Sequence, residues 1–257
     1  MSEKLRVCEV GISYLNSRGV SEKIIEDVSV SLAEGEIVSL LGVSGVGKTT
    51  LFNIINGLTA PDTGTVILDG LDVTGQSGKI GYMLQKDMLL PFKKVLDNVS
   101  LPLLLRGKPR KEARAAAAAY FDAFMLSGSE EKYPSQISGG MRQRAALLRT
   151  FLFGGNVILL DEPFSALDAM TRSQMQQWYL GIVRDFSISS LFITHDVDEA
   201  VLLSNRVYVM AGTPGRITGE FHITPPHDER AGFSASAAFL EQKARILNEI
   251  FPSDKQR

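Results

Sequence analysis

Eight consecutive residues, 42–49, read GVSGVGKT and restrict the fold more than any other part of this 257-residue chain. An apolar run, Ile37–Leu41, leads into them, and residues 48–56 have helical character. Glycines let successive backbone N–H groups turn inward as an anion-binding nest, and a helix N-terminus adds its positive end. The pattern therefore predicts a phosphate-binding loop between a buried strand and a helix. Lys48 is expected to reach the β- and γ-phosphates of a nucleotide, and Thr49 to offer a hydroxyl to Mg²⁺.

Short β-rich runs separated by helical segments extend through most of the chain. The further strand candidates are residues 66–68, 79–83, 157–160, 191–194 and 207–210. Several of these runs are continuously apolar, as parallel strands covered on both faces are. Residues 5–14 and 24–31 alternate more and predict an antiparallel sheet near the N-terminus. We therefore predict an α/β fold with a mostly parallel sheet.

Between residues 87 and 126 the β-branched residues become sparse. Residues 111–126, KEARAAAAAYFDAFML, are as strong a helix-forming stretch as the chain contains. This region is expected to be a helical insert in the α/β core. A second helical stretch, residues 238–250, follows Pro225 and is expected to cap the core or to mediate contacts.

Composition excludes several classes of protein. A content of 44% hydrophobic and 22% charged residues fits a soluble globular chain, and a formal charge of −2 gives no bulk positive charge for nucleic acid. No apolar run is long enough to span a bilayer, and the N-terminal residues carry charges where an export signal needs apolar ones. The only cysteine, Cys8, favours a reducing compartment.

Two adjacent carboxylates, Asp161 and Glu162, end the apolar run at 157–160. Neighbouring side chains of a strand point to opposite sides, so the two are expected to differ in role. Asp161 is expected to hold the Mg²⁺ shell, and Glu162 to orient and deprotonate the attacking water. His195 follows the run at 191–194, and the carboxyl ends of parallel strands meet at one edge of a sheet, so His195 is expected near Lys48 and Asp161. The alternative is that His195 is a local hydrogen-bonding cap.

Ser138, Gly139 and Gly140 precede a helical segment with an early basic cluster. A serine followed by two glycines at a helix start predicts a second anion nest, this one without a lysine. The alternative is an ordinary capped helix whose Arg142 and Arg144 form a solvated face.

Taken in order, these segments resemble the ATP-binding cassette (ABC) family along nearly the whole chain. The matching positions are the phosphate loop, Gln85, Ser138–Gly139–Gly140–Met141, Asp161–Glu162–Pro163, Ser165–Ala166–Leu167–Asp168 and Thr194–His195–Asp196. Met141 departs from the glutamine that is commoner in the family, and Arg149–Thr150 departs from its usual Ala-Arg-Ala ending.

The resemblance implies a site for ATP and Mg²⁺ shared by two chains. The implied ATP-binding residues are Tyr14, Gly42, Ser44, Gly45, Gly47, Lys48, Thr49 and Thr50, with Tyr14 stacked on adenine. The implied catalytic residues are Glu162, His195 and Gln85, and the implied Mg²⁺ contacts are Thr49, Gln85 and Asp161. The implied contacts with the partner's ATP are Ser138, Gly139, Gly140 and Met141, with Ser165 and Asp168 in the dimer-interface loop.

The resemblance also implies one domain over residues 1–257. Residues 1–86 and 146–225 are expected to form the P-loop NTPase core with its antiparallel β-subdomain, residues 87–145 an inserted helical subdomain, and residues 226–257 a helical tail. Sequence segments such as DEPFSALDAMTR, residues 161–172, are similar to segments of bacterial importers of the nitrate, sulfonate, taurine and pyrimidine-precursor group.

That similarity implies an ATP-hydrolysing importer subunit at the cytoplasmic face of the inner membrane. The implied partners are a second ATPase subunit, expected to be a homodimer partner, a transmembrane permease and an extracytoplasmic solute-binding protein, with no nucleic acid. The alternative is an ATPase of the same family that signals or scaffolds through a membrane partner.

Overall fold

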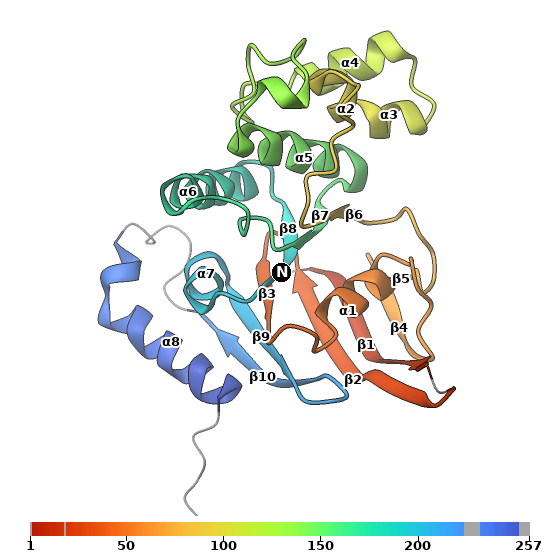
Figure 1. Ribbon diagram of the computed structural model, residues 1–257, viewed down its shortest axis with the longest axis vertical. Helices are drawn as coiled ribbons and strands as arrows, with labels where there is room; N and C mark the ends of the chain where they lie inside the picture. The colour runs from red at the N-terminus through yellow and green to blue at the C-terminus, as the bar shows by residue number, and fades with distance from the viewer. Residues whose placement is uncertain (1, 18, 224–231, 252–257) are drawn as a thin grey trace, which may run out of the picture. The chain divides into compact units, whose positions relative to one another are not determined.

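The computed structural model describes residues 2–17, 19–223 and 232–251, which divide into two compact units (Figure 1). Unit 1 is formed by Met1–Lys79 and Ser189–Arg257, and unit 2 by Ile80–Ile188. Part of the predicted tail at 226–257 lies outside the described residues. The predicted subdomain boundaries remain predictions.

Unit 1 contains two sheets. The antiparallel one has the order β2-β1-β4-β5, formed by β1 (Glu3–Leu15), β2 (Ser21–Ala33), β4 (Thr63–Leu68) and β5 (Leu71–Asp72). The other has the order β10-β9-β3-β8, formed by β3 (Ile37–Leu41), β8 (Ser189–Thr194), β9 (Arg206–Ala211) and β10 (Arg216–His222). Strands β8, β3 and β9 run parallel, and β10 is antiparallel to β9. The predicted fold class and antiparallel N-terminal sheet are confirmed.

The two sheets of unit 1 are joined through main-chain hydrogen bonds at one point. The Gly215 N–H donates to the Ile24 carbonyl at 2.9 Å, and the Glu26 N–H donates to the Gly215 carbonyl at 3.1 Å. Strand β2 therefore lies against the β9–β10 connection. Two helices of this unit follow strands of the second sheet: α1 (Lys48–Ile55) follows β3 through the phosphate loop, and α7 (Val197–Leu203) follows β8.

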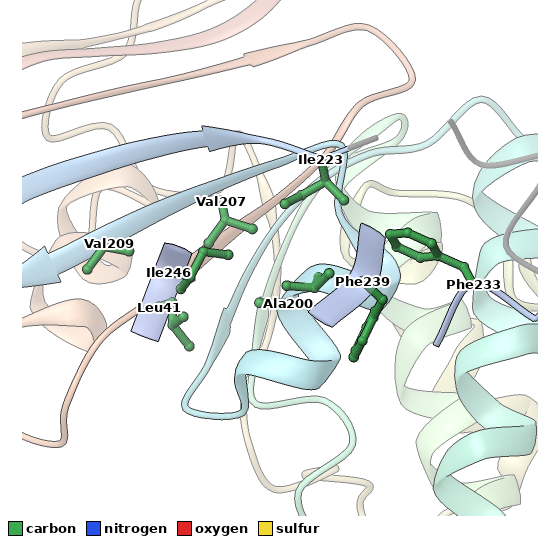
Figure 2. Packing of buried hydrophobic residues seen from close by; sticks show 9 residues of the cluster. Leu41, Ala200, Val207, Val209, Ile223, Phe233, Phe239 and Ile246 are labelled. Atoms are coloured by element: carbon green, nitrogen blue, oxygen red, sulfur yellow. The ribbon is translucent and has the colours of Figure 1, made fainter. Parts of the chain in front are cut away.

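The C-terminal helix α8 (Ala237–Ile250) belongs to the core of unit 1. Figure 2 shows Phe239 and Ile246 of this helix close to Ala200 of α7 and to side chains of the sheet. A short 3₁₀ turn, Phe233–Ala235, adds the buried Phe233 ring, which packs edge-on against Phe239 at a centroid distance of 5.5 Å. Lys243 of α8 also forms an ion pair with Asp198 of α7 at 2.6 Å. Of the two predicted roles for this stretch, capping the core is the one observed.

Unit 2 combines two parallel strands with helices. The strands are β6 (Gly81–Met83) and β7 (Val157–Asp161), and the helices are α2 (Val95–Val99), α3 (Leu101–Leu105), α4 (Arg110–Ala118), α5 (Gly139–Gly154) and α6 (Ala169–Asp185), with a 3₁₀ turn at Pro134–Gln136. Gly81 and Gly154 allow β6 and α5 to approach, because a Cβ on Gly154 would lie 2.2 Å from the Gly81 nitrogen.

The helix expected in residues 111–126 forms only in the first half of that stretch. Helix α4 ends at Ala118, and the next residues form turns that bury Phe121, Phe124 and Leu126. The Phe124 ring contacts Phe151 of α5 at a centroid distance of 6.1 Å. Tertiary packing of the aromatic rings therefore overrides the local helix propensity.

Arg206 of β9 makes several hydrogen bonds within unit 1. Its guanidinium donates to both Glu36 carboxylate oxygens at 3.0 Å, to Glu220 at 2.9 Å and to the Ser31 carbonyl at 2.9 Å. The Arg206 and Glu36 side chains are 13% and 12% exposed. Arg206 therefore joins four separate segments of unit 1 in a site with little water.

Arg206→Ala is expected to lower the free energy of unfolding by about 3–5 kcal/mol, because it leaves the Glu36 charge buried without its partner. Urea unfolding followed by circular dichroism measures the change. Arg216→Ala, which breaks the exposed pair with Glu26, is the matched control and should leave the urea midpoint nearly unchanged. Equal midpoints for the two variants would contradict the assignment.

Candidate functional site

The phosphate loop of unit 1 packs closely against a backbone carbonyl of β9 and a side chain of β2. A Cβ on Gly42 would lie 2.4 Å from the Met210 carbonyl oxygen of β9, and one on Gly47 would lie 2.4 Å from Cγ2 of Ile25 in β2. Gly45 and Gly47 have φ values of 84° and 108°, in the region that favours glycine. The loop conformation therefore requires glycine at these positions for steric as well as dihedral reasons.

Lys48 closes this loop from the first residue of α1. Its ammonium donates to the carbonyl oxygens of Gly42 at 2.7 Å and Val43 at 2.9 Å, and the side chain is 7% exposed. The ammonium group is thus held within the loop, with Ser44 and Gly45 exposed beside it. This arrangement fits a phosphate group, because a charged donor lies in the same loop as a helix N-terminus.

The other predicted residues of unit 1 are accessible. Thr49 is exposed and Thr50 half-buried in the first turn of α1, and Tyr14 of β1 is 45% exposed. His195 is exposed directly after β8. Asp196 beside it caps α7, because its carboxylate accepts the Asp198 and Glu199 N–H groups at 2.8 and 3.2 Å. The cap fixes where β8 ends and α7 begins.

In unit 2 the predicted carboxylates have different surroundings. Asp161 is the last residue of β7, and the Tyr82 hydroxyl of β6 donates to it at 3.4 Å. Burial and the Asp161 charge raise the pKa of Tyr82, so this hydroxyl remains a donor. Glu162 lies past the strand end and accepts a hydrogen bond from the Gln85 amide at 3.1 Å. The structure thus brings together Gln85 and Glu162.

Glu162 also has an unusual backbone. Its φ is 46°, a left-handed value that costs a non-glycine residue free energy and often occurs at functional sites. The next turn supports this conformation, because the Ser165 N–H and hydroxyl both donate to the Glu162 carbonyl, at 3.2 and 3.0 Å. The carboxylate is therefore placed by its own turn as well as by Gln85.

Ser138 and Asp168 of unit 2 are both N-cap residues of helices. The Ser138 hydroxyl accepts the Met141 N–H at 3.2 Å and caps α5, where Gly139 and Gly140 begin the helix. Asp168 accepts the Thr171 N–H at 3.0 Å and caps α6, and this hydrogen bond lowers the pKa of Asp168. Ser138 and Asp168 are exposed.

Arg142 and Arg144 do not form the solvated face that was the alternative prediction. Arg142 donates to Asp87 at 3.2 Å and to the Ile137 carbonyl at 3.0 Å. Arg144 lies 5.3 Å from the Trp178 ring centroid, and burial lowers its pKa. Both side chains are structural parts of unit 2.

Sequence reasoning missed three residues around the site. Tyr82 was hidden because its contact with Asp161 depends on the pairing of β6 with β7. Arg142 and Arg149 bind the segment after Gln85, and Arg149 donates to the carbonyls of Asp87 and Met88 at 2.6 and 2.8 Å. A basic cluster that begins four residues after Ser138 was the available signal, but it did not reveal the acceptors.

The residues of each unit fit the expected cofactors. Among the described residues no group of three or more His, Cys, Asp and Glu side chains could hold a metal. Mg²⁺ in nucleotide sites uses one or two carboxylates and completes its shell with phosphate oxygens and water. Each unit taken by itself offers a donor of this kind, the Thr49 hydroxyl in unit 1 and the Asp161 carboxylate in unit 2.

The chain is similar to known ATP-binding proteins of transporters. The sequence profile of the ABC transporter family matches residues 25–165. The formylaminopyrimidine import ATP-binding protein of Halalkalibacterium halodurans is 40% identical over 97% of this chain and 96% of its own length. The taurine import ATP-binding protein of Yersinia pestis is 42% identical over 94% of this chain and 97% of its own length.

The solved structures include a dimeric ATP-binding cassette in a post-hydrolysis state bound to ADP and phosphate. It is 27% identical, with a TM-score of 0.72, and the match covers 86% of this chain and all of the cassette. No helix in the described part of the chain is both long and apolar enough to cross a membrane. The predicted family and importer group are confirmed: the chain belongs to the ABC transporter family, among its import ATP-binding proteins.

Proposed function

We propose that two copies of this chain bind two ATP molecules at the interface between the chains, with Mg²⁺ as cofactor. ATP hydrolysis then drives uptake of a small solute through a separate membrane subunit. The observation that carries the proposal is the pairing of a complete phosphate loop with the Gln85–Glu162 hydrogen bond at 3.1 Å. The ABC family consists of ATPases, and the similar solved cassette is dimeric and bound to hydrolysis products.

Unit 1 supplies nucleotide binding in this proposal. The Lys48 ammonium lies within the loop, where it donates to two carbonyl oxygens, and it is proposed to reach the β- and γ-phosphates of ATP. Tyr14 is exposed enough to stack on adenine, and Thr49 lies in the first turn of α1, as a Mg²⁺ contact requires. His195 is proposed to hydrogen-bond the γ-phosphate and so to position Glu162.

Unit 2 supplies the catalytic carboxylate. Glu162 accepts a proton from the attacking water, and the Gln85 amide orients the carboxylate for that step. Asp161, held by Tyr82, and Gln85 contact the Mg²⁺ shell. Mg²⁺ neutralises charge on the phosphate oxygens when it is bound.

The segment Ser138–Met141 is proposed to complete the partner's site. It offers an exposed hydroxyl and an early helix turn, yet no lysine accompanies it. A dimer with two-fold symmetry places the same segment of each chain against the phosphate loop of the other. The loop with the half-buried Ser165 and the exposed Asp168 is proposed to lie in the same interface.

The direction of transport is inferred from the relatives. Both are named as import ATP-binding proteins, and their names specify different solutes, formylaminopyrimidine and taurine. This favours uptake over the signalling or scaffolding alternative. The proposed assembly contains a permease at the inner membrane, with this chain at its cytoplasmic face, and a solute-binding protein on the other side. Selection of the solute belongs to those two partners.

Lys48→Ala is expected to weaken ATP binding at least about tenfold, because it removes a charged hydrogen bond to the phosphates. Equilibrium binding of a fluorescent ATP analogue measures the affinity, and circular dichroism checks that the variant is folded. Lys79→Ala, at an exposed position outside the loop, is the matched control. A Kd within twofold of the parent would contradict the role of Lys48.

Glu162→Gln is expected to slow hydrolysis on the order of 10²-fold or more while ATP still binds. The amide keeps an oxygen for the Gln85 hydrogen bond but does not accept the proton of water. Phosphate release measures the rate, and size-exclusion chromatography is expected to show an ATP-bound dimer. A hydrolysis rate near that of the parent would mean that Glu162 is not the base, and His195 would be the next candidate. His195→Ala is also expected to hydrolyse ATP slowly.

Mixing two variants tests whether the site is shared. Ser138→Arg and Lys48→Ala, each combined with Glu162→Gln, are expected to trap no ATP alone. In the mixed dimer one interface joins both defects and the other joins a sound loop to a sound Ser138 segment, so about one ATP per dimer is expected. Radiolabelled ATP retained after rapid gel filtration gives the count.

Two controls accompany this mixing experiment. The Glu162→Gln chain alone should trap about two ATP per dimer. Ser138→Ala removes the helix cap without adding bulk and so measures the effect of the cap by itself. If mixing produces no gain over the separate variants, the shared site is wrong.

A further inference from the structure

The turn between α3 and α4 of unit 2 is strongly basic. Residues 105–111, LRGKPRK, are defined here as the basic tip; they contain four Lys and Arg and no Asp or Glu. The chain as a whole has a formal charge of −2, so the remainder carries −6 against the +4 of these seven residues. All seven are exposed. The tip is therefore a local positive patch on an acidic protein.

Main-chain hydrogen bonds hold the basic tip in one conformation. The Gly107 N–H donates to the Leu104 carbonyl at 2.9 Å, and the Lys108 N–H donates to the Leu103 carbonyl at 3.1 Å. With Gly107 at a φ of 84°, these two bonds form a Schellman motif that ends α3. Pro109 then precedes α4, and α3 packs against α4. The basic side chains are thus presented on an ordered turn.

The side chains of the tip fall into two groups. Arg106 and Arg110 are bound to the protein, through the Phe153 carbonyl and through Asp97 at 3.3 Å. Lys108 and Lys111 have no ion-pair or hydrogen-bond partner among the described residues. Leu105 beside them is 75% exposed. Two unpaired ammonium groups and an exposed apolar side chain therefore share one short turn.

We propose that the basic tip binds an anionic lipid surface directly. Each Lys or Arg near an anionic leaflet strengthens binding roughly fivefold, and an exposed leucine adds apolar contact at the headgroup level. Lysine side chains extend their ammonium groups to such a surface while their methylene stems cover apolar neighbours. The contact is weak by itself and adds to attachment through a membrane subunit.

The lipid surface is favoured over other anionic partners. A nucleic acid partner requires a broad positive field, whereas this chain is acidic outside the tip. A flat leaflet needs no matching pocket, and the tip offers exposed side chains between two helices. The inference concerns a surface that the proposed function leaves unassigned and does not depend on how ATP is hydrolysed.

Vesicle flotation of the full chain tests the proposal. The probes are phosphatidylcholine vesicles with and without about 30 mol% phosphatidylglycerol, at about 0.1 M and about 0.5 M NaCl. The parent chain is expected to bind the anionic vesicles at least about tenfold better, and to lose this preference at high salt. Lys108→Glu/Lys111→Glu is expected to lower anionic vesicle binding about 25-fold or more, and Leu105→Ser to lower it at both salt concentrations.

The matched control is Lys79→Glu/Arg184→Glu, which makes the same charge change at exposed positions outside the tip. It should bind anionic vesicles like the parent. ATPase activity should be unchanged in all these variants, which separates failure of this inference from failure of the proposed function. Equal binding to both vesicle types, or equal loss in the tip and control variants, would overturn the proposal. Loss of a copurifying membrane protein without any vesicle binding would replace the lipid with an acidic protein partner.

Discussion

The close approach of backbone to the phosphate loop is the constraint on which the rest of unit 1 depends. Gly42 lies against the Met210 carbonyl of β9, and Gly47 lies against Ile25 of β2. Any side chain at either position would overlap with a neighbour. Both sheets of the unit thus contact the loop. The main-chain hydrogen bonds between Gly215 and β2 join the two sheets. Nucleotide binding and folding of unit 1 therefore use the same contacts.

Unit 2 uses helix caps in a comparable way. Ser138 and Asp168 each satisfy a backbone N–H at the start of a helix, and both remain exposed. A side chain that caps the N-terminus of a helix is oriented by its hydrogen bond to the backbone, so it needs no additional packing to stay in place. Glu162 is fixed differently, by a turn at a φ of 46° and by the Gln85 amide. The polar residues proposed for chemistry are therefore held mainly by main-chain geometry.

How much the sequence predicts depends on how local the cause is. The phosphate loop, its strand and its helix were predictable because their signal lies within about twenty consecutive residues. The end of α4 at Ala118 was not, because it follows from burial of Phe121 and Phe124 against distant rings. Strand β10 escaped notice because its burial alternates between exposed and half-buried, without a fully apolar face. Tyr82 required knowledge of the β6–β7 pairing.

The split of unit 1 between the two ends of the chain has a consequence for synthesis. Strand β3 pairs only with β8 and β9, and β8 begins at Ser189, roughly 150 residues after Leu41. At typical rates of translation the strand that carries the phosphate loop waits roughly 10 to 30 s for its first neighbour. All of unit 2 leaves the ribosome within that interval and can fold first. Helix α8 emerges later still, and its Phe239 and Ile246 share a buried cluster with Leu41 and Val209, so the nucleotide-binding core closes only after α8 has left the ribosome (Figure 2).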